Sequence, residues 1–337
     1  MDRVTRPLAC VSASVIFGLS LSGPAHAALT LTADGIADGF TLSTVVGGFF
    51  GSYGPLGEAI LPNGNFVTGS ASTDRIYVFK DIDGQTLSDA LIATPYVFQT
   101  GNPQYVMATV GGKAYGAQVQ GGTFVQFAND GSFAPIPGLT GLTANLGMWG
   151  DTANGHLIAS SNQGLVDIDP GAGSFRVVNA GVFPDGVTVS PDGKVIYAEV
   201  GGNINSYDEL TGAFIQTFSG GGHSPDGTGV ISGGVFDGDI VVNNNDGTVG
   251  LLDTTTGIET IIANGGTRGD FVSPDTNNGT LFLSQQDQVA RLSCGEGCSI
   301  GGPPPPPPPA IPEPASSALL AVGLAGLFAM TRRRAGH

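Results

Sequence analysis

The sequence contains few basic residues, few cysteines and a single tryptophan. Among its 337 residues, 12 Lys and Arg stand against 28 Asp and Glu, for a formal charge of −16. Such an acidic chain repels nucleic acids and anionic lipid surfaces, so partners of those two classes are excluded. Two of the three cysteines, Cys294 and Cys298, have no histidine close in sequence, and two thiols alone make a poor zinc site.

The N-terminus has the pattern of a secretory leader. Two arginines precede the apolar stretch 8–21, and a small-x-small cleavage site ends at Ala27. This pattern predicts a signal peptide over residues 1–27, cut between Ala27 and Ala28 during export through the secretion translocon.

The C-terminus contains three parts in a fixed order. A Pro-Glu-Pro box precedes the uncharged run 315–330, and three arginines end the segment; these parts are Pro312, Glu313 and Pro314, then Arg332, Arg333 and Arg334. With 16 residues the run is shorter than the ~20 that cross a bilayer comfortably, so we expect a single short transmembrane helix that anchors only marginally. The arginines should stay cytoplasmic, which leaves everything before the box outside the inner membrane. A permanent anchor and a processed sorting signal both fit, and the ordered parts favour the sorting signal.

Residues 311–337 resemble the PEP-CTERM sorting signal, on the box, the short apolar segment and the basic end. In Gram-negative bacteria this signal is read and cut by a membrane protease called an exosortase. The resemblance implies that the protein is held transiently in the inner membrane and then reaches the cell surface or extracellular matrix. Exosortase systems accompany exopolysaccharide production, which implies exopolysaccharide as a partner.

The region between the two targeting segments is expected to fold as one domain. This domain covers residues 28–300, and residues 301–310, with seven consecutive prolines, form a semi-rigid linker. Residues 28–310 carry seven basic and 26 acidic side chains, a formal charge of −19, which keeps the domain soluble and could attract divalent cations. In an oxidising compartment, the C-x-x-x-C spacing of Cys294 and Cys298 favours a local disulfide over a metal site.

A unit of about forty residues recurs six times in this domain. Its marker is a strand with apolar residues at both ends, found at 76–79, 124–127, 165–168, 204–207, 249–252 and 289–292. Positions three apart on a strand point to opposite faces, so the markers belong to sheets that are covered on both sides. Turns rich in Asp, Asn and Gly precede and follow the markers, and these residues tolerate the positive φ of tight hairpins.

Two hairpins per unit give four strands, which is the blade of a β-propeller. The sequence therefore predicts an all-β, six-bladed β-propeller. The sixth unit ends at Cys298 without its fourth strand, which would leave an unpaired edge. Segment 40–46 is similar to the missing strand, so we expect this N-terminal strand to close the last blade.

Blade one resembles an NHL repeat in segment 54–66 and the strand 75–79, and blade four is similar at 190–197. NHL-like propellers are similar to the gluconolactonase and senescence-marker family, lactonases that hold calcium or zinc at the axis with a first-blade Glu, an Asn and an Asp. The resemblance implies that Glu58 is the first-blade Glu. It also puts Val200 where the family has its catalytic Asp, which argues against hydrolysis by that mechanism.

Glu58 and Asp270 are the candidate metal ligands. Aligned by their turns, they take equivalent positions in blades one and six, which are neighbours in a closed ring. Asp185, Asp226 and Arg268 are expected in nearby entrance loops. Such an acidic ring could hold calcium. The alternative, that these are solvated turn residues, is favoured because no anchoring motif accompanies them.

Catalytic motifs are missing from the sequence. It has no nucleophile elbow, no His-Glu-x-x-His segment and no phosphate loop, and no catalytic residue is assigned. We therefore expect an exported surface or extracellular-matrix protein that works by binding, as a scaffold associated with exopolysaccharide. A divergent metal-dependent propeller hydrolase of the lactonase type, or a lyase, is the alternative.

Overall fold

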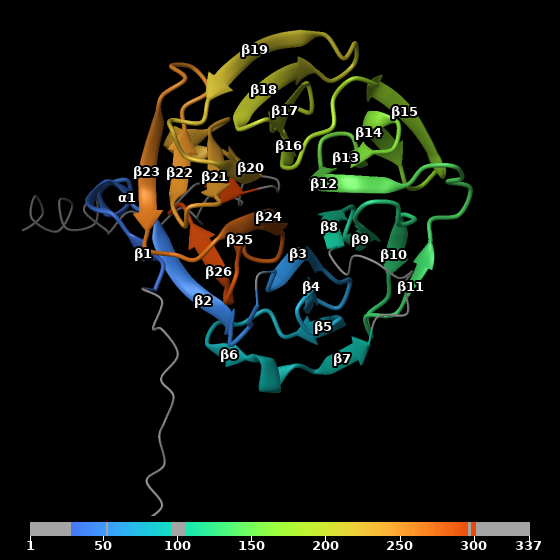
Figure 1. Cartoon of the computed structure of the whole chain (residues 1–337), viewed down its shortest axis with the longest axis horizontal. Coiled ribbons are helices and arrows are strands. Elements are labelled where there is room, and N and C mark those ends of the chain that lie inside the picture. Colours follow the sequence, from blue (N-terminus) through green and yellow to red (C-terminus); the bar gives the residue numbers. More distant parts are fainter. Residues whose placement is uncertain (1–27, 52, 96–104, 296–297, 301–337) are drawn as a thin grey trace, which may run out of the picture.

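Six sheets, each with four antiparallel strands as its blade, stand around a central axis in the computed structural model, as Figure 1 shows. The structure describes residues 28–51, 53–95, 105–295 and 298–300. The predicted all-β, six-bladed propeller is therefore confirmed. The predicted signal peptide, linker, short transmembrane helix and sorting signal lie outside the described residues. Among the residues that are described, no helix is both long and apolar enough to cross a membrane.

Each blade has four strands that follow one another outwards from the axis. Blade one has β3 (Pro55–Ile60), β4 (Phe66–Ser70), β5 (Arg75–Phe79) and β7 (Ile92–Pro95); blade two has β8 (Tyr105–Val110), β9 (Lys113–Gln118), β10 (Val125–Phe127) and β11 (Phe133–Pro135); blade three has β12 (Ala144–Asp151), β13 (His156–Ser161), β14 (Gly164–Asp169) and β15 (Ser174–Asn179). Blade four has β16 (Val187–Val189), β17 (Val195–Val200), β18 (Asn203–Asp208) and β19 (Phe214–Ser219); blade five has β20 (Pro225–Ser232), β21 (Ile240–Asn244), β22 (Val249–Leu252) and β23 (Glu259–Asn264); blade six has β24 (Gly269–Asp275), β25 (Thr280–Gln285), β26 (Gln288–Ser293) and β2 (Thr41–Gly47). The six predicted marker strands are the third strands of the blades.

The ring closes where an N-terminal strand completes the last blade. β2 pairs antiparallel with β26, with Thr41 opposite Ser293 and Leu42 opposite Leu292. The predicted closure is confirmed, and it joins two segments that lie about 250 residues apart in sequence. β2 gives the sixth blade its fourth strand, so the edge of β26 is not left unpaired.

Several short strands and helices lie outside the four-stranded blades. β1 (Thr30–Leu31) pairs with the outer strand of blade five, and the helix α1 (Ala33–Ala37) follows it. The Thr32 hydroxyl caps that helix by accepting a hydrogen bond from Gly35 N at 3.1 Å. The remaining short elements are β6 (Gln85–Thr86), η1 (Leu87–Asp89), η2 (Gly234–Phe236) and β27 (Ser299–Ile300).

Neighbouring blades contact each other through their buried inner strands. Hydroxyls bridge these strands: Ile60 N donates to Thr109 Oγ1 at 2.7 Å, and Val230 N donates to Thr188 Oγ1 at 3.1 Å. Between blades six and one, the rings of Phe66 and Phe282 lie 5.1 Å apart. Burying such a side chain fully contributes about 1.5–3 kcal/mol, so apolar packing between the blades stabilises the ring.

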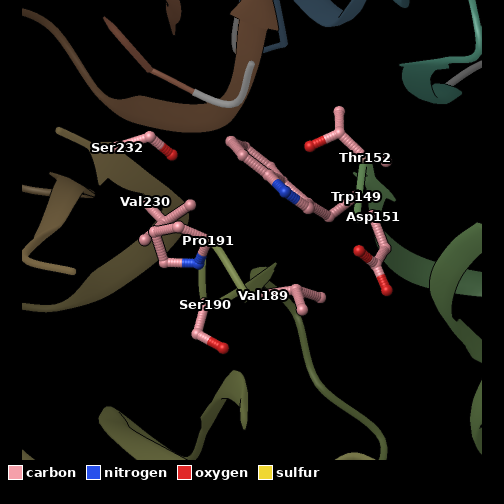
Figure 2. A pocket seen from close by; sticks show the side chains of 9 residues that line it. Trp149, Asp151, Thr152, Val189, Ser190, Pro191, Val230 and Ser232 are labelled. Atoms are coloured by element: carbon pink, nitrogen blue, oxygen red, sulfur yellow. The ribbon is translucent and has the colours of Figure 1, made fainter. Parts of the chain in front are cut away.

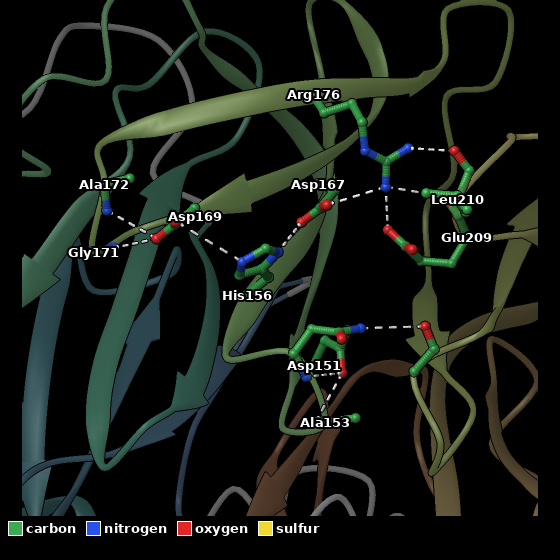
Figure 3. Close-up of polar contacts among 12 residues, drawn as sticks. Asp151, Ala153, His156, Asp167, Asp169, Gly171, Ala172, Arg176, Glu209 and Leu210 are labelled. Atoms are coloured by element: carbon green, nitrogen blue, oxygen red, sulfur yellow. Dashed lines mark hydrogen bonds and ion pairs between the residues drawn. The ribbon is translucent and has the colours of Figure 1, made fainter.

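The seam between blades three and four also has a polar network (Figure 3). Arg176 of β15 donates to Asp167 Oδ2 at 3.1 Å, and to Glu209 and the Leu210 carbonyl in the turn after β18. His156 lies beside the same cluster, with its Nδ1 2.8 Å from Asp167 Oδ1. Arg176 therefore ties the outer part of one blade to the next.

Candidate functional site

A pocket of about 270 Å³ opens at one end of the propeller axis. It is lined by residues of five blades, namely Tyr53, Gln120, Leu146, Asp185, Arg268, Asp270 and Phe271. Most of them lie just before an inner strand or in its first residues, so the pocket is on the face where the inner strands begin. We call this the upper face, and the face where they end the lower face.

Bulges in the inner strands turn acidic side chains toward the pocket. In β20, Pro225 pairs with Asn244 and Gly227 with Asn243, so Asp226 is the extra residue. In β24, the register shifts between Gly269 and Val272, so both Asp270 and Phe271 stand in the irregular segment. A bulge re-aims side chains, which explains how two consecutive residues of β24 both line the pocket.

Arg268 connects two of these carboxylates at the pocket. Its Nη2 lies 3.1 Å from Asp226 Oδ2, and its Nη1 donates to Asp270 Oδ2. The guanidinium carbon is 4.8 Å from the centre of the Tyr53 ring, a cation–π contact. Two charge-assisted bonds and one ring contact hold the planar group in place.

Burial sets the protonation of the acidic groups here. Burial raises the pKa of Asp270 to about 7, against the lowering effect of Arg268. Burial also raises the pKa of Asp226 well above its usual value, and the nearby Asp270 and Asp185 add to that shift. The same cause raises the pKa of Asp185, opposed by Arg268. The pKa values of all three carboxyls are therefore shifted upward, with burial as the largest cause.

Gln120 has an unusual backbone conformation. Its φ is +58°, and only Asp74 joins it as a non-glycine residue with positive φ among the described residues. This left-handed conformation costs about 1 kcal/mol for a residue with a side chain. The pocket thus keeps a polar side chain at a position where glycine would be less strained, and residues in strained conformations cluster at functional sites.

Glu58 lies in β3, buried against blade six rather than exposed in the pocket. Its side chain is fully buried, and Oε1 accepts a hydrogen bond from Ser284 Oγ at 2.6 Å. Its Oε2 has no hydrogen-bond partner among the described residues. Burial raises the pKa of Glu58 to about 7, and the Asp270 carboxyl contributes to the shift.

The two predicted metal ligands differ in strand register. Glu58 follows the bulge of β3 and pairs with Thr68, whereas Asp270 stands in the bulge of β24. Within the described part of the chain, no group of three or more His, Cys, Asp or Glu side chains could hold a metal ion. Calcium binding by Glu58 and Asp270 stays a prediction.

The structure also places the other residues that the sequence analysis singled out. Asp185, Asp226 and Arg268 do gather at the axial entrance, although Asp226 belongs to β20 and not to a loop. A disulfide joins Cys294 and Cys298. Sequence reasoning missed Tyr53 and Gln120; the available signal was an aromatic or polar side chain next to glycine in an entrance turn.

A second, smaller cavity lies where the inner strands of blades three, four and five end. Figure 2 shows the indole of Trp149 lying across this space, with Val230 and Ser232 on its far side. The cavity there measures about 10 Å³, enough for roughly one water molecule. The pocket at the upper face is therefore the larger of these two cavities.

Comparisons with known proteins agree with the sorting motif and with the propeller fold. Residues 310–334 match the family model of the PEP-CTERM protein-sorting motif. No curated protein matches the chain in sequence. The motif implies processing by an exosortase and export directed to the cell surface.

Solved structures share the fold at low sequence identity. A gluconolactonase from Xanthomonas campestris is 16% identical, with a TM-score of 0.58 over 81% of this chain and 98% of that one. A protein of unknown function from Bacteroides thetaiotaomicron is 12% identical, with a TM-score of 0.55 over 77% of this chain and 76% of that one. These likenesses concern the fold alone. The chain is thus a six-bladed β-propeller protein that carries a PEP-CTERM sorting motif at its C-terminal end.

Proposed function

We propose that the protein is a surface or extracellular-matrix binding protein that is sorted by exosortase and holds exopolysaccharide in its axial pocket. The observation that carries this proposal is the position of the pocket relative to the C-terminal end of the propeller. The pocket opens on the upper face, and the last described strand, which leads toward the sorting motif, lies at the lower face.

Strand β20 relates the two faces directly. Asp226, near its start, bonds to Arg268 of the pocket, and Ser232, at its end, pairs with Ser299 of β27. Six residues of extended strand separate Asp226 from Ser232, which corresponds to about 20 Å. A propeller attached through its C-terminal segment would therefore direct the pocket away from the point of attachment.

The chemistry of the pocket suits a polar ligand with apolar faces. Arg268, Asp185 and Gln120 offer hydrogen-bond donors and acceptors, and Tyr53, which is 42% exposed, offers an accessible ring. Binding sites combine such apolar walls with a few polar groups that fix orientation. The choice of exopolysaccharide also rests on the sorting motif, because exosortase systems accompany its production.

Co-purification of polysaccharide from intact cells tests this function. The exported protein should carry bound polysaccharide, and Tyr53→Ala should reduce the bound amount at least tenfold. Phe214→Ala is the matched control, because Phe214 is an exposed ring (57%) on the outer strand of blade four, away from the pocket. Wild-type protein that carries no polysaccharide, or equal loss in both variants, would count against the proposal.

The competing proposal is a metal-dependent hydrolase of the lactonase type. It is favoured by the buried Glu58, whose raised pKa of about 7 suits proton transfer near neutral pH, and by the fold shared with a gluconolactonase. Metal analysis and lactone turnover by the purified exported protein decide between the two. Bound metal together with turnover that Glu58→Gln abolishes would establish the enzyme.

A further inference from the structure

The charges around the axial pocket restrict which saccharides it accepts. We propose that the pocket binds a neutral polyhydroxylated ring of hexose size and rejects the corresponding uronate. This inference rests on the proposed function, because it names the chemical class of ligand for the same site.

The cation of the pocket is already paired with acidic side chains. Arg268 already bonds to Asp226 and Asp270, so its positive charge has two carboxylate partners. A third carboxyl, Asp185, lines the same cavity. Where Asp270 and Asp185 are ionised, the carboxylate of a uronate would meet negative charges in excess over the guanidinium, and like charges at short range disfavour binding.

The same ion pairs argue against a cationic ligand. The two most buried carboxyls of the site, on Asp226 and Asp270, have side chains 4% and 11% exposed and are bridged by the Arg268 guanidinium. An ammonium group or a metal ion would have to displace that guanidinium or lie beside it. The position between these carboxyls is thus filled by a cation of the protein itself.

The polar groups that remain suit hydroxyls. The bonds to Asp226 and Asp270 use two of the five N–H groups of Arg268, and the Gln120 amide has both a donor and an acceptor. Asp185 offers a further acceptor. A hydroxyl both donates and accepts, so a neutral polyol can satisfy such a mixed set without introducing a charge.

The shape and walls of the pocket fit a ring with apolar faces. The cavity of about 270 Å³ lies near the lower end of the range of small-ligand sites, which corresponds to one saccharide unit. The Tyr53 ring, Leu146 and Phe271 supply its apolar lining. Tyr53 is fixed from behind, because Ser72 Oγ and Ser72 N donate to its carbonyl at 2.7 and 3.1 Å.

The backbone of Gln120 is an independent observation. Glycine takes the positive-φ position in many turns of this chain, but the turn after β9 has glutamine there at φ +58°. Gln120 is one of the residues that line the pocket. Gln120 N donates to the Asn145 carbonyl at 3.0 Å, so a ligand would meet this residue on a turn whose backbone is already held.

Ligand-observed NMR on the purified exported protein tests the inference with matched pairs of probes. The probes are glucose, galactose and mannose, the uronates of the same three sugars, and glucosamine as the cationic member. At least one neutral hexose should bind, with its uronate and amine at least tenfold weaker. A uronate or amine that binds as well as its hexose, or no binding by any hexose, overturns the inference.

Substitutions test whether the hexose binds in the axial pocket. Gln120→Gly relieves backbone strain, so it should fold normally, and it should weaken the hexose at least tenfold. Asp74→Gly removes the only other such strain among the described residues, outside the pocket lining, and should leave binding unchanged. Asp185→Asn should improve uronate binding relative to hexose, and an unchanged ratio would contradict the charge argument.

Failure of this inference can be told from failure of the proposed function. If the cellular polysaccharide binds in a Tyr53-dependent manner but the uronate probes bind best, the function holds and the ligand class is wrong. If the polysaccharide and all probes fail to bind, both proposals fall.

Discussion

Arg291 of blade six donates a hydrogen bond to Asp81 of blade one, across the seam where the ring closes. The same guanidinium bonds to Asp83, and its Nε lies 3.3 Å from Asp275 Oδ2. Ser43 of the closing strand also donates to Asp83, at 2.7 Å. The Asp81/Asp83 pair, which could be mistaken in sequence for calcium ligands, thus holds an arginine of the protein.

Removing Arg291 should open this seam. Its side chain is only 13% exposed, so Arg291→Met leaves the fully buried Asp275 without its charge partner and should cost about 3–5 kcal/mol of unfolding free energy. Arg176→Met is the matched control, because that side chain is 37% exposed and should cost about 1 kcal/mol. Urea titrations measure both, and equal losses would contradict the assignment of the closing seam to Arg291.

The disulfide should stabilise the lower face. Cys294 and Cys298 enclose a short loop, for which chain entropy predicts about 2 kcal/mol. The double variant Cys294→Ser/Cys298→Ser should lose that amount and also exchange the Ser232 amide faster, because Ser232 pairs with Ser299 of β27 just after the disulfide. Reduction of the wild-type protein is the control and should reproduce the loss of unfolding free energy. An unchanged amide exchange rate would show that the pairing of β27 does not depend on the disulfide.

The outer parts of the blades follow from local sequence, and the inner parts do not. All six marker strands appear as third strands because their turns and apolar ends are set by nearby residues. The innermost strands lack that signal. β20 begins Pro225-Asp226-Gly227, which has the composition of a turn, and its strand conformation depends on the neighbouring blades.

The site was predictable only in part, for the same reason. Asp226, Asp270 and Arg268 could be assigned to the axial entrance from the blade repeat. Their contacts could not, because the bulges that aim Asp226 and Asp270 shift the register of each strand by amounts that depend on tertiary packing. The left-handed backbone of Gln120 had no sequence signal beyond the two glycines that follow it.

Processing at both termini should be visible in the mass of the exported protein. We expect loss of residues 1–27 and of the segment after the Pro-Glu-Pro box. Glu313→Gln should keep the C-terminal segment if exosortase recognises the box, and Glu296→Gln is the control outside the motif. An exported wild-type protein that keeps residues 315–337 would refute cleavage at the box.

Glu58 should make the propeller less stable as the pH rises. Its pKa is about 7 in the folded protein, against an ordinary value of 4.5, so folding favours the protonated form. The stability that this group contributes is fully present below pH 4.5 and is lost as the pH rises through 7. A shift of this size corresponds to about 3 kcal/mol, so Glu58→Gln should be more stable than wild type by up to that amount at pH 8.

Denaturant titrations at pH 5 and pH 8 measure this difference. At pH 5 the variant and the wild type should be nearly equal in unfolding free energy, because Glu58 is then protonated and resembles the amide. Asp89→Asn is a control of opposite sign, because hydrogen bonds from Thr86 lower the pKa of Asp89 and its contribution is present at neutral pH and lost in acid. If Glu58→Gln changes stability equally at both pH values, the side chain is not protonated near neutral pH. Its burial beside Asp270 then has to be balanced by a cation, which would support the calcium hypothesis.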